Sequence, residues 1–250
     1  MILYTAECGV ARIVLNRPEK RNALSPELID ALKTALARAA RDPEVRVVVI
    51  SGTGADFCAG ADLAALDRTS EEGVMDHLGS ARALAEVFLA IRHHPHPVIA
   101  TVRGRALAGG CGLATACDLI LASESAQFGY PEVKLGFVPA MVMAILRRSL
   151  SEKRAFELIA TGEMITAPQA HAVGLINRVY PDNEFDAQSE EYITALAAKS
   201  ASAVALSKNL LYHMDGMTFE AAVEAGVHGN ALARMTEDAR RGIERFVKKS

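Results

Sequence analysis

Apolar and polar residues alternate along the chain with two periods, which predict strands and helices in turn up to about residue 180. Short apolar runs rich in β-branched residues predict strands at 2–4, 10–15, 45–50, 98–102, 118–122 and 176–179. The first two runs flank Cys8 and Gly9, which predicts an opening hairpin. The pattern as a whole predicts an α/β fold.

Helical spacing of apolar residues is clearest over 28–39. Ser25 and Pro26 are typical of the N-cap and the first residue of such a helix, and Asp42 and Pro43 indicate its end.

The chain from residue 184 onward shows only helical patterns, with breaks expected near Gly216 and Gly229. No charged linker or Ser/Pro-rich hinge sets this part apart. We therefore expect one structural unit with a core over 1–183 and a helical C-terminal region over 184–250, which could serve contacts between subunits.

Composition excludes several classes of protein. The 250 residues are 50% hydrophobic and 23% charged, which is typical of a globular chain. The net charge of −3 argues against nucleic acid or a membrane surface as a partner, but not against a small anionic ligand. Four cysteines without a C-x-x-C pair, no basic and apolar leader, and no apolar run of 18 residues favour a cytoplasmic location.

Two glycine-rich loops, at 52–62 and 104–112, each follow a predicted buried strand. Such loops let a backbone approach a ligand closely and direct free N–H groups at negative charge, although each could also be an ordinary turn. Neither contains a G-x-G-x-x-G or a G-x-x-x-x-G-K-[ST] motif, which argues against nicotinamide and P-loop nucleotides.

Glu132 is the candidate for acid–base chemistry. It follows Pro131, which suits a first helical position, and aromatic and aliphatic residues flank it. Apolar surroundings disfavour the charged carboxylate and so raise its pKa toward a useful range. The alternative is that Glu132 only stabilises a helix N-terminus.

Three histidines, His93, His94 and His96, follow a helix predicted over 75–91. Proline scatters their rings and no cysteine or carboxylate is nearby, so we expect no metal there.

These loops and Glu132 resemble motifs of the crotonase superfamily, the enoyl-CoA hydratase/isomerase family. The resemblance covers essentially the whole chain. Its motifs are 21–24 (RNAL), 59–63 (AGADL), 108–113 (AGGCGL) with 117–118 (CD), 128–136 (FGYPEVKLG), 160–162 (ATG) and 172–176 (AVGLI).

The resemblance implies a spiral of β-β-α turns, a homotrimer or dimer of trimers, and a coenzyme A thioester as substrate, with no separate cofactor and no metal. It implies that the backbone N–H groups of Ala61 and Gly109 bind the thioester oxygen and stabilise an enolate. The other residues it implies in substrate binding are Arg21, Ala23, Leu24, Ala59, Asp62, Leu63, Gly110, Gly112, Pro131, Ala140, Phe246 and Lys249.

Gly112 departs from the family pattern. Typical hydratases have two catalytic glutamates; here the second is Glu132, while the first position is Gly112. The resemblance therefore leaves three possibilities open: hydration or dehydration with a single acid–base glutamate (the methylglutaconyl type included), double-bond isomerisation by the same glutamate, and an acyl-CoA binding protein without activity. Residues 63–78 are expected to line part of the acyl pocket, and His77 there is expected to face solvent.

Overall fold

A six-stranded sheet forms the centre of the computed structural model, which describes residues 1–63 and 73–248. Its strands are, in spatial order, β1 (Ile2–Glu7), β2 (Val10–Leu15), β3 (Val47–Gly52), β4 (Val98–Val102), β6 (Leu119–Ser123) and β9 (Arg178–Tyr180). The first two are antiparallel, as the predicted hairpin requires, and all later neighbours are parallel.

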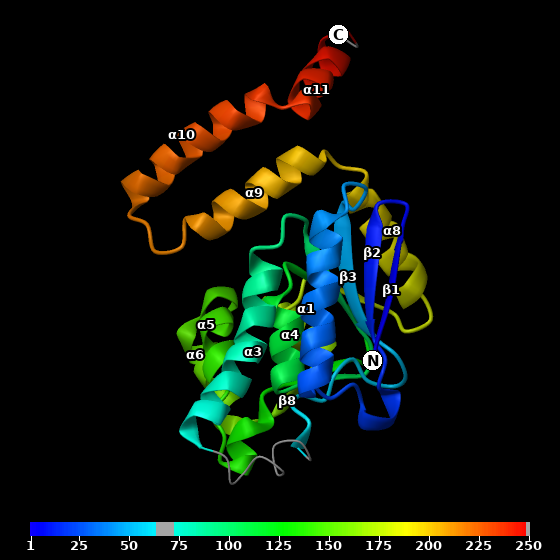
Figure 1. Ribbon diagram of the computed structural model, residues 1–250, viewed down its shortest axis with the longest axis vertical. Coiled ribbons are helices and arrows are strands. Elements are labelled where there is room, and N and C mark those ends of the chain that lie inside the picture. The colour runs from blue at the N-terminus through cyan, green and yellow to red at the C-terminus, as the bar shows by residue number, and fades with distance from the viewer. Residues whose placement is uncertain (64–72, 249–250) are drawn as a thin grey trace.

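Helices cover both faces of this sheet, which explains why its central strands are apolar throughout. The helices α1 (Pro26–Arg41), α3 (Val74–Arg92) and α4 (Gly109–Ala116) lie on one face (Figure 1). The helix α8 (Phe185–Ala197) lies on the other face, where its Phe185 and Ile193 are buried against the strands. The α8 helix is therefore packed into the body of the molecule, although the sequence places it in the C-terminal region.

The predicted start of α1 is confirmed. The Ser25 hydroxyl accepts a hydrogen bond from the Leu28 N–H, and Pro26 is the first helical residue. Leu28, Leu32 and Leu36 return on one face of the helix and are almost fully buried.

A second, three-stranded sheet was not predicted from the sequence. It consists of β5 (Arg105–Leu107), β7 (Gln127–Gly129) and β8 (Met164–Thr166), with β7 in the middle. Three residues are too few to show an alternating pattern, so only the tertiary pairing defines these strands.

The remaining helices of the described residues connect and follow the strands. They are η1 (Pro18–Lys20) and η2 (Pro131–Leu135), both 3₁₀, then α5 (Ala140–Ser149), α6 (Glu152–Thr161), α7 (Ala167–Ala172), α9 (Ala201–His213), α10 (Phe219–Met235) and α11 (Glu237–Val247). Within the described ranges, no helix is both long and apolar enough to cross a membrane.

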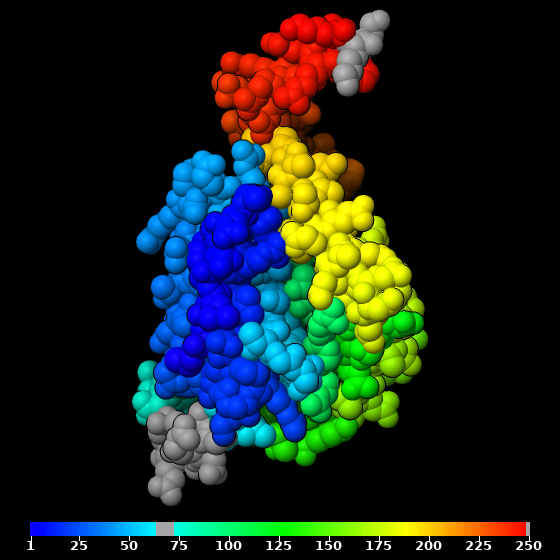
Figure 2. Space-filling view, turned by 90° about the vertical axis from the view of Figure 1, so that its right-hand side faces the viewer, coloured from blue at the N-terminus to red at the C-terminus, as the bar shows by residue number. Residues whose placement is uncertain are grey.

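The helices α10 and α11, here called the C-terminal arm, extend away from the body (Figures 1 and 2). Neither helix has a buried residue, and large apolar side chains such as Phe219, Met235 and Phe246 are 70–79% exposed. The predicted break near Gly216 is confirmed, since Gly216 has a φ of +84° and lies between α9 and α10.

The break predicted near Gly229 is wrong, because Gly229 lies inside α10. A Cβ at this position would lie 3.0 Å from Cδ2 of Leu210 on α9. Glycine here allows α9 and α10 to approach each other and does not interrupt the helix.

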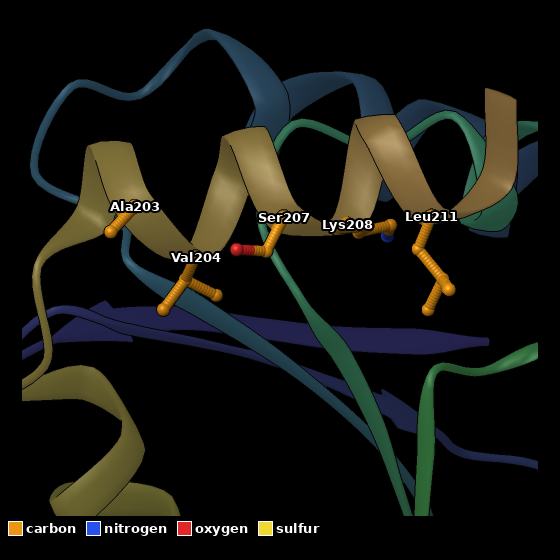
Figure 3. Close-up of a pocket in the computed structure, with 5 residues that line it drawn as sticks. All are labelled: Ala203, Val204, Ser207, Lys208 and Leu211. Carbon is orange, nitrogen blue, oxygen red and sulfur yellow. The ribbon is translucent and has the colours of Figure 1, made fainter. Parts of the chain in front are cut away.

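Lys208 attaches α9 to the body of the molecule. Its Nζ donates hydrogen bonds to the carbonyl oxygens of Ile91 and His96 and forms an ion pair with Asp118 Oδ2 at 2.7 Å. Figure 3 shows a pocket along this side of α9, lined by Ala203, Val204, Ser207, Lys208 and Leu211. None of these residues belongs to the predicted site.

Candidate active site

The two glycine-rich loops meet, as the resemblance implies, and bring the backbone of Ala61 next to Gly109. The loop after β3 pairs with the segment before α1: the Leu24 N–H donates to the Gly60 oxygen at 2.7 Å, and the Asp62 N–H donates to the Leu24 oxygen at 3.2 Å. In this parallel pairing the Ala61 N–H is directed away from the segment before α1. A Cβ on Gly109 would lie 4.0 Å from the Ala61 nitrogen, so both amides border the same space.

Glycines make this approach possible. Gly60 has a φ of +97°, and a Cβ on it would lie 2.8 Å from the Ala108 Cβ. A Cβ on Gly110 would lie 2.3 Å from the Cys58 oxygen. Any side chain at either position would push the two loops apart.

The backbone at Ala108 is strained, with φ 50° and ψ −128°, a region that residues with a Cβ rarely adopt. Its amide is held by a hydrogen bond to the Gly129 oxygen at 2.9 Å. Ala108 is the N-cap of α4, and no side chain caps that helix. The first N–H groups of α4, beginning with Gly109, therefore offer partial positive charge to an anion.

Glu132 lies in η2 directly after Pro131, as expected, and is half-buried. Its Oε2 is buried and has no hydrogen-bond partner among the described residues. Burial raises the pKa of this carboxyl above its ordinary value, and a bond to its own backbone N–H opposes the rise only in part. The Glu132 side chain thus has a raised pKa and one oxygen without a partner in the described part of the chain.

Gly112 is buried in α4, and apolar side chains fill the space beside it. A Cβ at this position would lie 2.6 Å from Cγ2 of Val142 and 3.2 Å from Cζ of Phe88. The place of the family's first glutamate is therefore an apolar wall.

The loop before α1 depends on Asn22, which sequence reasoning missed. The side chain of Asn22 is fully buried; its Nδ2 donates to the oxygens of Thr53 and Asp56 at 2.9 Å each, and its Oδ1 accepts from the Arg17 N–H at 2.9 Å. Arg17 also binds Asp62 at 3.0 Å. These bonds hold 17–24 against 53–62, which places Leu24 beside Gly109.

Arg105 and Asp56 form a second pair that sequence reasoning missed. Two guanidinium nitrogens of Arg105 donate to the two carboxylate oxygens of Asp56 at 2.8 Å each. This pair lowers the pKa of Asp56, and the nearby charge of Arg21 adds to the effect. Arg21 itself is exposed, with a φ of 50°, at the edge of the site.

The remaining predicted binding residues divide into three groups. Ala23 and Leu24 are buried, and a Cβ on Gly109 would lie 3.5 Å from Leu24 Cδ1. Ala59 directly precedes Gly60 in the loop after β3 and is half-buried. Leu63 and Ala140 are exposed, as is His77, which agrees with the expectation for that histidine.

Phe246 lies on α11, which extends away from the body at the far end of the arm (Figure 1). Lys249 lies outside the described residues, and so does the 64–72 part of the segment predicted to line the acyl pocket.

The histidines near Pro95 have structural contacts. His94 is buried, and its Nε2 lies 3.2 Å from the Leu36 oxygen. Burial lowers the pKa of His94 to about 4, so the ring is neutral at pH 7. In the part of the chain that the structure describes, no group of three or more potential ligands is arranged to hold a metal ion.

The chain is similar to known proteins over nearly its whole length. The family model for enoyl-CoA hydratase/isomerase matches residues 5–250. A Thermus thermophilus protein with enoyl-CoA hydratase in its name is 41% identical over 240 residues, which cover 96% of this chain and 95% of that protein. The 2,3-dehydroadipyl-CoA hydratase of Escherichia coli is 35% identical over 99% of this chain and 96% of its own.

A crystal structure of an enoyl-CoA hydratase from Mycobacterium smegmatis superposes with a TM-score of 0.94 at 34% identity, over 99% of this chain and 96% of that one. The fold is therefore the crotonase fold expected from the resemblance, and relatives with this fold are named as enzymes. The chain belongs to the enoyl-CoA hydratase/isomerase family.

Proposed function

We propose that the protein acts on an enoyl-CoA thioester with Glu132 as its single acid–base group and with the N–H groups of Ala61 and Gly109 as donors to the thioester oxygen. The observation that supports this most is the buried, unpartnered Oε2 of Glu132, whose pKa burial raises. A desolvated carboxylate favours uptake of a proton, and formation of an enolate requires a base that takes up a proton.

The two amides supply the electrostatic part of the reaction. When an enolate forms, the thioester oxygen gains negative charge, and preorganised N–H donors at that oxygen lower the barrier by several kcal/mol. The amides of Ala61 and Gly109 border one space, and Gly109 adds the positive end of α4.

Hydration and its reverse are the first candidate reaction, supported by the names of the relatives. Glu132 would take a proton from water as the water oxygen bonds to C3 and the π electrons move toward the thioester oxygen. The same carboxyl would then return the proton to C2. A branched substrate of the methylglutaconyl type belongs to this candidate.

Isomerisation of the double bond is the second candidate, and the apolar wall at Gly112 favours it. Glu132 would take a proton from C2 of a 3-enoyl-CoA, the electron pair would pass to the thioester oxygen, and the carboxyl would deliver the proton to C4. The double bond then lies between C2 and C3. This route needs neither water nor a second carboxylate.

Coenzyme A would be held by the loop around Arg21, with that guanidinium near a phosphate. The substrate would bring the coenzyme, so no separate cofactor is proposed. Phe246 and Lys249 would close over coenzyme A from the arm of a neighbouring copy. The exposed apolar residues of the arm support contact between copies of the chain. The homotrimer or dimer of trimers rests on the family resemblance, and a cytoplasmic location stays a prediction.

Glu132→Gln tests the assignment. Hydration of crotonyl-CoA and isomerisation of a 3-enoyl-CoA are measured for the wild type and the variant. The matched control is Glu44→Gln, which changes an exposed carboxylate between α1 and β3. We expect Glu132→Gln to abolish turnover and to keep acyl-CoA affinity in calorimetry. Full turnover in that variant contradicts the proposal, and no turnover in the wild type supports a protein that only binds acyl-CoA.

A further inference from the structure

The helices α3, α4 and α5 lie close together (Figure 1). Gly112 of α4 has Phe88 of α3 and Val142 of α5 as its nearest side-chain neighbours. Phe88 and Val142 are 6% and 3% exposed. Both are side chains that cannot hold a proton or a water molecule by hydrogen bonds. The wall they form faces the same helix whose N-terminal amide is proposed to bind the thioester oxygen.

We propose that Val142, together with Gly112, favours the double-bond shift over water addition at this site, because it fills the space that a polar side chain at position 112 would need. This inference rests on the proposed function, in which Glu132 handles the proton. It assigns specificity to a residue that would not touch the proton being transferred.

The distances identify Val142 as the main obstacle. A Cβ on residue 112 would lie 2.6 Å from Val142 Cγ2, closer than carbon atoms can approach without a shift, but 3.7 Å from Val142 Cβ, an ordinary contact. Replacing Val142 by alanine therefore removes the obstacle while the backbone of α5 stays in place. Phe88 Cζ, at 3.2 Å, needs to yield only by a few tenths of an ångström.

It follows that the sequence position alone does not decide the reaction. A glutamate installed at 112 with Val142 present would be forced out of line or would force α5 away from α4. A glutamate installed together with Val142→Ala would have room, and it could hold and activate a water molecule.

Two measurements test the proposal, and the first does not involve activity. Thermal unfolding is compared for Gly112→Ala, Val142→Ala and the double variant, with Val87→Ala, a fully buried valine on α3, as the control partner. We expect Gly112→Ala to lower the unfolding midpoint in the wild-type background and to have little or no further effect beside Val142→Ala. Beside Val87→Ala its effect should be unchanged. Equal effects of Gly112→Ala in all three backgrounds overturn the proposed wall.

The second measurement is the ratio of hydration to isomerisation rates. We expect G112E/V142A to raise this ratio at least tenfold above both the wild type and G112E. A ratio in G112E alone as high as in the double variant overturns the proposal, since Val142 would then exclude nothing. Should G112E fail to fold while the double variant folds, the result supports the wall.

The two proposals can fail separately. Activity that persists in Glu132→Gln contradicts the proposed function, whatever the ratio. An unchanged ratio in a folded G112E/V142A whose activity still depends on Glu132 contradicts only the role of Val142.

Discussion

The Gly60 α-carbon lies so close to Ala108 that a Cβ added to Gly60 would be 2.8 Å from the Cβ of Ala108. This contact joins the loop after β3 to the N-terminus of α4. Because Gly60 has a φ of +97°, both its conformation and its surroundings require the absence of a side chain. Gly60 thereby fixes the distance between the amides of Ala61 and Gly109, although its own N–H is not one of the two proposed donors.

Gly60→Ala should therefore separate the two donors. We expect kcat for an enoyl-CoA substrate to fall about 100-fold or more, the usual effect of losing one donor to an oxyanion. Steady-state kinetics measure this loss, and thermal unfolding measures the accompanying change in stability.

Gly79→Ala is the matched control for this substitution. Gly79 lies in α3 with open space around its α-carbon, so alanine there should raise helix stability by up to about 1 kcal/mol and leave kcat unchanged. A Gly60→Ala enzyme as fast as the control would show that the two loops can part without harm to the site.

Asn22→Gly should destabilise the protein, because the carbonyl oxygens of Thr53 and Asp56 lose a donor and the Arg17 N–H loses an acceptor. We expect the free energy of unfolding in urea to fall by about 3 kcal/mol. Glycine is chosen since Asn22 has a φ of 55°, which glycine adopts without strain. Asn230→Ala, at an exposed position of α10, should change stability by less than about 0.5 kcal/mol.

Features set by neighbouring residues could be predicted from the sequence. The N-cap at Ser25 with Pro26 depends only on neighbouring residues. The apolar β-branched runs predict buried strands whichever strands pair with them. The burial of Glu132 followed from its apolar flanks, and burial does raise its pKa. The resemblance added the pairing of the two loops, which no periodicity contains.

Features set by distant residues could not be predicted. Gly112 is visible in the sequence as a missing carboxylate, but the residue that fills the space, Val142, lies thirty positions further on and on another helix. Gly229 looks like a helix break until Leu210 is placed against it. The carbonyl partners of Asn22 likewise become partners only when 53–56 folds back on that loop.

Glu132→Gln should make the folded protein more stable at pH 7. Since burial raises the pKa of Glu132 in the folded state, the folded chain binds this proton more tightly than the unfolded chain does. The stabilisation that proton binding gives the wild type is fully present below the pKa of Glu132 in the unfolded chain. It is lost as the pH rises through the pKa of Glu132 in the folded protein. At pH 7 the wild type therefore retains a desolvated carboxylate that glutamine avoids.

Denaturant unfolding of both proteins between pH 4 and pH 7.5 measures this difference. We expect the advantage of Glu132→Gln to shrink as the pH falls toward 4.5, the ordinary value for this group. A variant less stable than the wild type at pH 7 would contradict a destabilised carboxylate.

In the wild type, kcat/KM for a 3-enoyl-CoA should rise with pH through the same raised pKa of Glu132, since the base must be ionised.

Lys208→Met should be strongly destabilising, because it leaves Asp118 buried without its cation. Asp118 would keep hydrogen bonds from the Tyr212 hydroxyl at 2.6 Å and the Val98 N–H at 2.6 Å, yet its charge would be uncompensated. Removing one partner of a buried ion pair costs about 3–5 kcal/mol, and denaturant unfolding measures that loss.

The double variant Lys208→Met/Asp118→Asn separates the ion pair from the packing of α9. We expect it to recover a large part of the lost free energy, because no buried charge remains while the Tyr212 hydroxyl still has an acceptor. Additive losses in the double variant would mean that the two charges are not coupled. Limited proteolysis should cut Lys208→Met near α9 faster than the wild type. The Lys208 ammonium also binds the Ile91 and His96 oxygens, and so it ties α9, with the arm that follows it, to the end of α3 and to the segment before β4.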